Sequence, residues 1–235
     1  MRRRIPIFII TLLLAGTLLS RDAAAEEFEI DTENSLIAVI THKAGIIALV
    51  SHNHLIYAQD YDATLNIDGD DLTSATFRIS FPTKNLVVSD NEGHERWNPA
   101  ILRAGILEKP LEKTSPKNRA KIREHMLSQK QLHAKKFPKI AAKLTQVRED
   151  DAEEPGHTHT HLATLELTLH GQTVTHDFPT TMAFDEGVLH IEALVTCNFS
   201  DFGIKPYSAL GGAIKNQDFF HFYINLRATS TATTD

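Results

Sequence analysis

Histidines give the strongest chemical signal in this chain, with 13 among 235 residues. His52 and His54 are two residues apart in an expected strand, which puts both side chains on one face, about 6.7 Å apart along the chain. Two such imidazoles can bind one metal ion through bonds of about 2 Å if a third ligand comes from elsewhere. The pair could also form a polar gate that holds a ligand head group, or simply hydrogen-bond to nearby backbone. The sequence leaves all three interpretations open.

A second group consists of His157, His159 and His161, in an H-x-H-x-H pattern. In an extended chain all three side chains face the same way, an arrangement that suits transition metals. The preceding segment 149–156 is acidic and ends in Pro-Gly, which is typical of a mobile loop. We therefore predict adventitious binding of Zn, Cu or Ni here, with no firm metal site and no cofactor required.

Catalysis has little support in the sequence. A hydrolytic enzyme needs a nucleophile, a base and an oxyanion site, and the chain contains no G-x-S-x-G, H-E-x-x-H, P-loop or G-x-G-x-x-G motif. Its one cysteine, Cys197, follows a strand-like run and is expected to be a buried, inert thiol. We predict that the protein is not an enzyme. A metal-assisted hydrolase built on the histidines is the weakest alternative.

The N-terminal segment is typical of a secretory signal peptide. Three arginines at positions 2–4 precede the apolar run Ile5–Leu19, and small residues follow at Ala23-Ala24-Ala25. The apolar run is short for a membrane span, which needs about 20 residues. We predict a signal peptide over residues 1–25 and a periplasmic or secreted protein with no stable membrane span after cleavage.

Net charge limits the classes of partner. Cleavage would change the net charge from −6 to −9, because residues 1–25 carry four arginines and one aspartate. An acidic chain is a poor partner for nucleic acid. Anionic membrane surfaces are expected to be unfavourable as well, although Lys135, Lys136, Lys139 and Lys143 form a local basic patch.

Alternating apolar and polar residues dominate the chain after residue 27. This pattern predicts antiparallel strands with one buried face. The alternating segments are Ala63–Ile67, Ala75–Phe81, Ala163–Leu169, Leu189–Val195 and Phe220–Leu226. Short polar turns at 68–71, 170–172 and 185–187 connect neighbouring strands. Many short strands at this spacing favour a β-sandwich or a closed barrel.

The alternation stops in the middle of the chain. Segment 89–137 is charged and contains Pro99 and Pro110, which indicate loop. Within it, Ser115 as N-cap and Pro116 at the first helical position predict a short helix that continues through Lys117–Leu132. At the other end of the chain, residues 231–235 form a polar tail that is expected to fray.

Four motifs in order resemble the YceI-like family of secreted, lipocalin-like proteins. They are Ile30-Asp31 with Ser35, Ile122–Leu127 followed by Leu132–Pro138, Leu167–Thr173, and Phe199–Ile204. The resemblance covers residues 26–230, nearly all of the mature chain. This sequence departs from the commoner pattern in the length of segment 89–116 and in the paired histidines that end segment 45–54.

The resemblance implies an all-β, eight-stranded lipocalin-like barrel with a short helical insertion around an elongated apolar cavity. It also implies a long-chain apolar small molecule as partner: a polyisoprenoid, an isoprenoid quinone or a fatty amide or acid, bound without catalysis. The sequence leaves open whether the protein forms a homodimer. The alternative is a periplasmic metal-binding protein that uses the paired histidines. Combining the expected inward faces with the motifs gives these ligand-binding candidates: His52, His54, Phe77, Ile79, Phe81, Trp97, His125, Met126, Leu165, Leu167, Phe202, Phe220 and Phe222.

Overall fold

The structure is a computed structural model that describes residues 25–45, 52–150 and 158–231. The predicted signal peptide lies outside these residues except for Ala25, and the predicted tail lies outside them except for Thr231. His157 and segment 46–51 are also outside the described part of the chain. No helix in the described ranges is long and apolar enough to span a bilayer.

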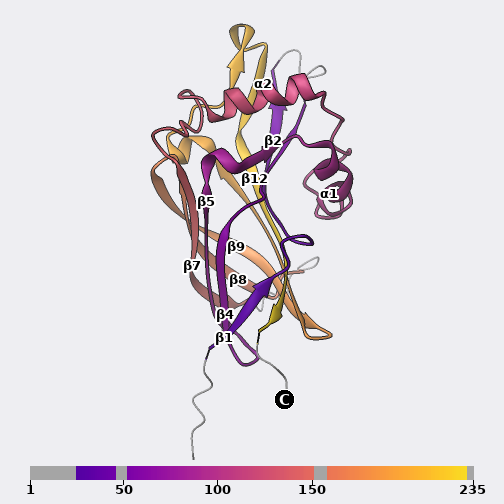
Figure 1. Cartoon of the computed structure of the whole chain (residues 1–235), viewed down its shortest axis with the longest axis vertical. Helices are drawn as coiled ribbons and strands as arrows, with labels where there is room; N and C mark the ends of the chain where they lie inside the picture. The colour runs from indigo at the N-terminus through magenta and orange to yellow at the C-terminus, as the bar shows by residue number, and fades with distance from the viewer. Residues whose placement is uncertain (1–24, 46–51, 151–157, 232–235) are drawn as a thin grey trace, which may run out of the picture.

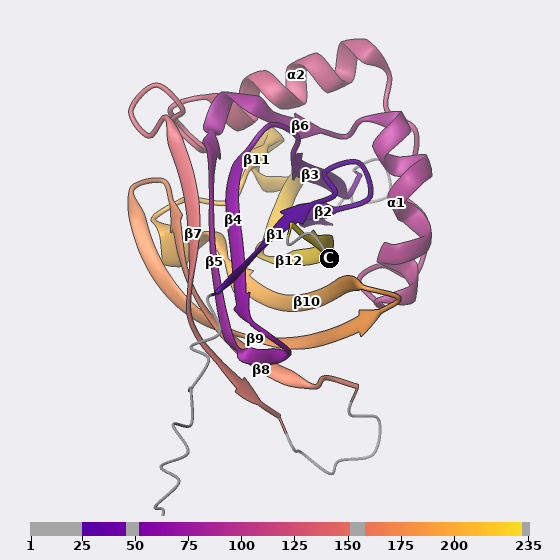
Figure 2. The same ribbon diagram turned by 60° about the horizontal axis from the view of Figure 1, so that its bottom comes forward.

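Eight antiparallel strands close into a barrel, as predicted (Figure 1, Figure 2). They are β1 (Glu26–Ile30), β4 (Asp62–Asp68), β5 (Asp71–Pro82), β7 (Lys139–Glu149), β8 (His161–Leu169), β9 (Gln172–Asp185), β10 (Val188–Asn198) and β12 (Ile214–Ser230). Each strand pairs with the next in this order, and β12 closes the ring by pairing with β1. The sequence follows this arrangement because its alternating segments place apolar side chains on the inner face.

Strand β12 changes partner along its length. Near its end Ser230 pairs with Phe28 of β1, whereas near its start Lys215 pairs with Ala44 of β2 (Leu36–Ala44). Strand β2 continues into β3 (His54–Ala58) and β6 (Leu86–Val88) by antiparallel pairing, and β11 (Ser208–Ala209) pairs with the start of β12. In the upper half of the barrel in Figure 1, β2, β3 and β6 therefore form part of the wall.

The predicted turns lie where the polar segments placed them. His170 and Gly171 between β8 and β9 both have positive φ, 52° and 75°. Glu186 and Gly187 between β9 and β10 also have positive φ, 49° and 79°. Two consecutive positive φ values match the right-handed twist of the flanking strands and allow a two-residue hairpin.

The lower half of the barrel is packed with side chains. Its inward-facing residues are buried and meet across the interior. They include Phe28, Leu65, Ile67, Phe77, Leu165, Phe178, Leu189 and Leu226.

Helix α1 (Asn91–Arg103) corrects the expectation of a loop through this region. Asp90 caps it by accepting a hydrogen bond from Gly93 N at 3.1 Å. Pro99 lies inside the helix, where it removes one backbone donor without ending the helix. The helix forms because Ala100 and Ile101 pack in a second apolar cluster on the outer face of β2 and β3, and this burial outweighs the local preference against helix.

Helix α2 (Pro116–Leu127) has the predicted start, with Asn118 N donating to Ser115 Oγ at 3.3 Å. It ends five residues before the predicted Leu132, because Ser128 N turns back to the carbonyl of His125. The helix lies across the upper end of the barrel (Figure 1).

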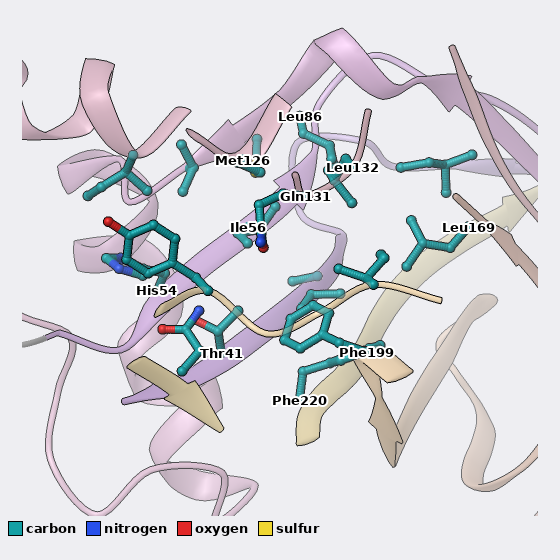
Figure 3. Close-up of a pocket in the computed structure, with 18 of the residues that line it drawn as sticks. Thr41, His54, Ile56, Leu86, Met126, Gln131, Leu132, Leu169, Phe199 and Phe220 are labelled. Carbon is teal, nitrogen blue, oxygen red and sulfur yellow. The ribbon is translucent and has the colours of Figure 1, made fainter. Parts of the chain in front are cut away.

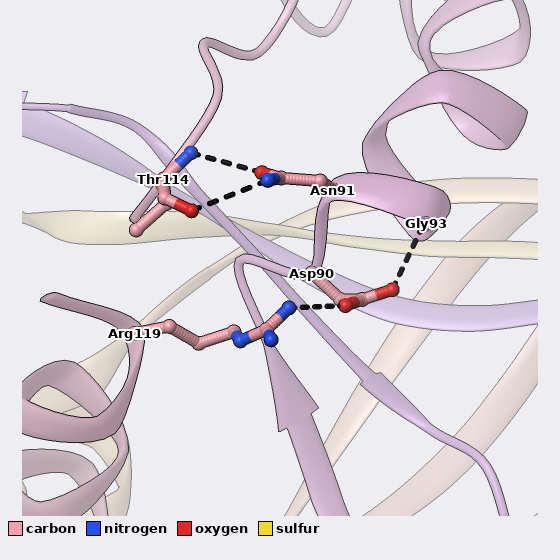
Figure 4. Close-up of polar contacts among 5 residues, drawn as sticks. All are labelled: Asp90, Asn91, Gly93, Thr114 and Arg119. Carbon is pink, nitrogen blue, oxygen red and sulfur yellow. Dashed lines mark hydrogen bonds and ion pairs between the residues drawn. The ribbon is translucent and has the colours of Figure 1, made fainter. Parts of the chain in front are cut away.

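Polar contacts join the start of α1 to the segment that leads into α2 (Figure 4). The Arg119 guanidinium forms an ion pair with Asp90, the N-cap of α1. The Asn91 side chain accepts from Thr114 N at 2.9 Å and donates to Thr114 O at 3.3 Å. These contacts fix the position of α2 over the barrel end.

Replacing Gly45 by alanine is expected to destabilise the upper wall. Gly45 has φ +98°, and a Cβ there would collide with the Ala213 carbonyl that follows β11. In Gly69→Ala, by contrast, the new Cβ has no neighbour within 4 Å, so only the left-handed backbone is strained. We expect Gly69→Ala to cost about 1 kcal/mol of unfolding free energy and Gly45→Ala about 3 kcal/mol in urea titrations. Equal losses would show that the Ala213 contact is unimportant.

Candidate functional site: an apolar cavity under helix α2

A cavity of about 520 Å³ occupies the upper half of the barrel. Its walls come from β2, β3, β5, β7, β8 and β12, with α2 and the following loop above it (Figure 3). Most of the lining is aliphatic or aromatic: Ile37, Val39, Ile56, Leu86, Ile122, Leu132, Ile140, Ala142, Leu169 and Phe199, together with the predicted residues named below. Pockets of this size and character bind apolar small molecules.

Most predicted ligand-binding residues lie on the cavity wall. These are His52, His54, Ile79, Phe81, His125, Met126, Leu167, Phe202, Phe220 and Phe222. Phe77 and Leu165 also face inward. They lie two residues nearer the packed lower end than Ile79 and Leu167, and they belong to the core there. Trp97 lies on α1 and packs against the outer face of the barrel, so it does not cover the opening.

Sequence analysis missed the contribution of β2, whose residues Ile37, Val39 and Thr41 line the cavity. The signal was hidden because β2 is buried on both faces: Leu36, Ala38 and Ile40 pack under α1. A strand of that kind does not alternate between apolar and polar residues.

One polar spot interrupts the apolar wall. Thr41 and His54 are cross-strand partners, and both line the cavity (Figure 3). The Thr41 hydroxyl is buried and has no hydrogen-bond partner among the described residues, whereas His54 Nδ1 lies 2.8 Å from Ser89 Oγ. Because a buried hydroxyl is normally hydrogen-bonded, the Thr41 hydroxyl is available to a polar group in the cavity.

Burial, with smaller effects of the neighbouring His52 and His94, lowers the pKa of His54 to about 4. Its imidazole is therefore neutral at neutral pH. A neutral ring can donate or accept a hydrogen bond but does not attract an anion.

His52 occupies a different setting from its predicted partner. Strand β3 begins at His54, so His52 precedes the strand instead of lying within it. Its Nδ1 is 2.9 Å from Glu112 Oε2, although the atoms are not aligned as a hydrogen bond. In the described ranges no group of three or more His, Cys, Asp or Glu side chains could hold a metal ion.

Cys197 is a buried thiol, as predicted, with 1% of its surface exposed. Burial, with a smaller effect of Asp201, raises its pKa to about 12. The thiolate that a nucleophile requires is therefore absent at neutral pH.

The depressed pKa of His54 predicts a pH-dependent stability. Below pH 6.5 this histidine takes up a proton in the unfolded chain but not in the folded chain. The free energy of unfolding is therefore at its full value above pH 6.5 and decreases as the pH falls toward 4. His54→Asn is expected to remove about 2 kcal/mol of the difference in unfolding free energy between pH 7 and pH 5. Urea titrations at both values measure this difference. Identical pH dependence in the variant and the parent would contradict the prediction.

Comparisons with known proteins agree with this architecture. BcnA of Burkholderia cenocepacia has 12% identity and a TM-score of 0.57, covering 86% of this chain and 100% of its own. The YCEI protein of Campylobacter jejuni has 11% identity and a TM-score of 0.50, covering 76% of this chain and 85% of its own. No curated protein matches the sequence. The model of the YceI-like domain matches residues 28–226, and the chain therefore belongs to the YceI-like family.

Proposed function

We propose that this protein is a periplasmic or secreted binding protein for a long apolar or amphiphilic molecule, such as a polyisoprenoid, an isoprenoid quinone or a fatty amide or acid. The hollow, apolar upper half of the barrel carries this proposal. The hydrocarbon tail would lie between Ile79, Phe81 and Phe220, and the polar head would lie near Thr41 and His54.

The energetics are sufficient for such a role. Removing a dozen methylene groups from water supplies roughly 10 kcal/mol at about 0.8 kcal/mol each. Association and ordering of the tail take a large part of this gain. The remainder supports useful affinity for a molecule that water dissolves poorly, and no chemical step is required.

The polar spot supports a specific orientation and an uncharged head group. The unpartnered Thr41 hydroxyl can donate to a carbonyl or ether oxygen of the ligand. The neutral His54 ring beside it can form a second hydrogen bond. These two groups support the polar-gate interpretation of the His52 and His54 pair. A metal site at His52 and His54 has less support, because the described residues provide no third ligand.

Native mass spectrometry of protein purified from its own host tests the proposal directly. We expect a co-purified lipid, and displacement of that lipid by an added isoprenoid quinone. Ligand-free protein that also fails to bind long-chain quinones, alcohols and amides would show that the proposal is wrong.

Filling the cavity should abolish binding. Ala142 is buried in the cavity wall, and Ala142→Trp would occupy the space of the hydrocarbon tail. Ala183→Trp makes the same change on the exposed face of β9. We expect the first variant to lower affinity for an isoprenoid quinone at least tenfold and the second to leave it unchanged, as measured by native mass spectrometry. Circular dichroism confirms that both variants fold, and equal affinities would contradict the assignment of the cavity.

Removing the unpartnered hydroxyl should have opposite effects on stability and binding. Thr41→Val keeps the shape of the side chain, so unfolding free energy in the absence of ligand should rise by about 1 kcal/mol. Affinity for an isoprenoid quinone should fall about fivefold, because the bond to its carbonyl is lost. Thr175→Val, on the exposed side of β9, is the control and should change neither quantity. Unchanged affinity in Thr41→Val would place the head group elsewhere.

A further inference from the structure

Charge is strongly segregated in this protein. Residues 113–143 contain ten lysines and arginines and one acidic residue, Glu124. This segment therefore carries a net charge of +9 within a chain of net charge −6, which leaves −15 for all other residues. Net charge alone suggested that anionic surfaces would be unfavourable partners, but that expectation assumes evenly distributed charge.

The fold places this basic segment at the upper end of the barrel. This is the open end, because exposed residues of α2, such as Lys121 and His125, line the cavity there. It includes α2, the loop that follows α2 and the start of β7, all around the upper rim in Figure 2. Most of its cations are exposed: Lys117, Lys121, Lys130, Lys135, Lys136 and Lys139. In the described part of the chain, only two cations of this segment form ion pairs. Lys113 pairs with Glu95, and Arg119 pairs with Asp90. The other lysines keep their charge available to a partner.

An exposed apolar side chain lies at the same end. Leu210, in the short 3-10 turn η4 (Leu210–Gly212), is 74% exposed, the largest exposure of any large hydrophobic residue in the described ranges. Its hairpin projects at the top of Figure 1. Two contacts connect the preceding segment to α2 and its loop: Tyr207 packs against His125 with ring centroids 5.6 Å apart, and Gln131 Nε2 donates to Lys205 O at 3.0 Å.

We propose that this basic rim, defined as residues 113–139 with Leu210, docks the open end of the barrel onto a membrane surface rich in anionic lipid. Each lysine near such a surface is attracted to its negative potential, and Leu210 is positioned to enter the interfacial region. The opposite end carries the acidic turns 68–71 and 185–186 and is repelled, which sets the orientation. This inference rests on the proposed function, since a ligand that water dissolves poorly must pass between a bilayer and the cavity mouth.

The cavity mouth and the rim share residues, which connects docking with ligand exchange. Lys113, Lys121 and His125 line the cavity and belong to the rim. A docked protein would therefore present the cavity opening to the bilayer. Nucleic acid also carries dense negative charge, but it offers no partner for the exposed Leu210.

Vesicle flotation of the full protein tests the docking surface. The ligand-free protein is expected to bind vesicles of phosphatidylcholine and phosphatidylglycerol at 7:3, to bind pure phosphatidylcholine at least tenfold more weakly, and to dissociate as salt is raised. Lys117→Glu combined with Lys130→Glu and Lys135→Glu should weaken binding by roughly fivefold or more for each lysine. None of these three residues lines the cavity, so binding of an isoprenoid quinone in detergent solution should be unchanged.

A charge-matched control uses three exposed arginines outside the rim: Arg78→Glu, Arg148→Glu and Arg227→Glu. This variant changes the net charge by the same amount and should keep most of its vesicle binding. An equal loss in both variants would show that total charge matters and not the rim, and equal binding to both vesicle types would also overturn the proposal.

A fluorescent label reports the orientation. Leu210→Cys labelled with an environment-sensitive dye should shift to shorter wavelength on anionic vesicles, whereas Asp185→Cys at the opposite end should not. The native Cys197 is buried and should not react. Binding to duplex DNA as tight as binding to vesicles, with no shift at position 210, would indicate a general polyanion site and overturn the proposal. Vesicle binding without quinone binding would instead reject the proposed function and leave the docking surface intact.

Discussion

Closure of the barrel depends on one edge of β12, which finds a partner over almost its whole length. At its lower end β12 pairs with β1, and the barrel closes with eight strands. At its upper end it pairs with β2, and β3 and β6 continue the wall beside β2. Side chains of the inner face meet and pack in the lower half, whereas in the upper half the same inner face surrounds the cavity.

Much of this fold could be predicted from local sequence. Alternation in Ala75–Phe81 fixed an inner face, and the polar turns at 170–172 and 185–187 fixed the hairpins. The start of α2 was predictable from Ser115 and Pro116. In each of these cases the residues that determine the structure are close together in the sequence. The ends of elements that depend on distant contacts were less predictable, as the early termination of α2 at Leu127 shows.

The candidate site was predicted only in part, because depth within a barrel is a property of tertiary structure. Phe77 and Ile79 share a face and differ by two positions, yet one packs in the core and the other lines the cavity. Helix α1 was missed because its stability comes from burial against β2, which no local pattern near Pro99 reveals. The Thr41–His54 pairing joins strands whose connection gives no sequence signal of its own.

Pairing between β1 and β12 also has a consequence for how the chain reaches its native state. Phe28 and Ser230 are partners across almost the full length of the sequence, and Thr231 N donates to Glu27 O at 2.9 Å. Such high contact order slows folding, and a nascent chain that still lacks its last strand would leave β1 and β10 with open edges. Open edges recruit other chains. The intermediates before ring closure are therefore the species most prone to aggregate during synthesis.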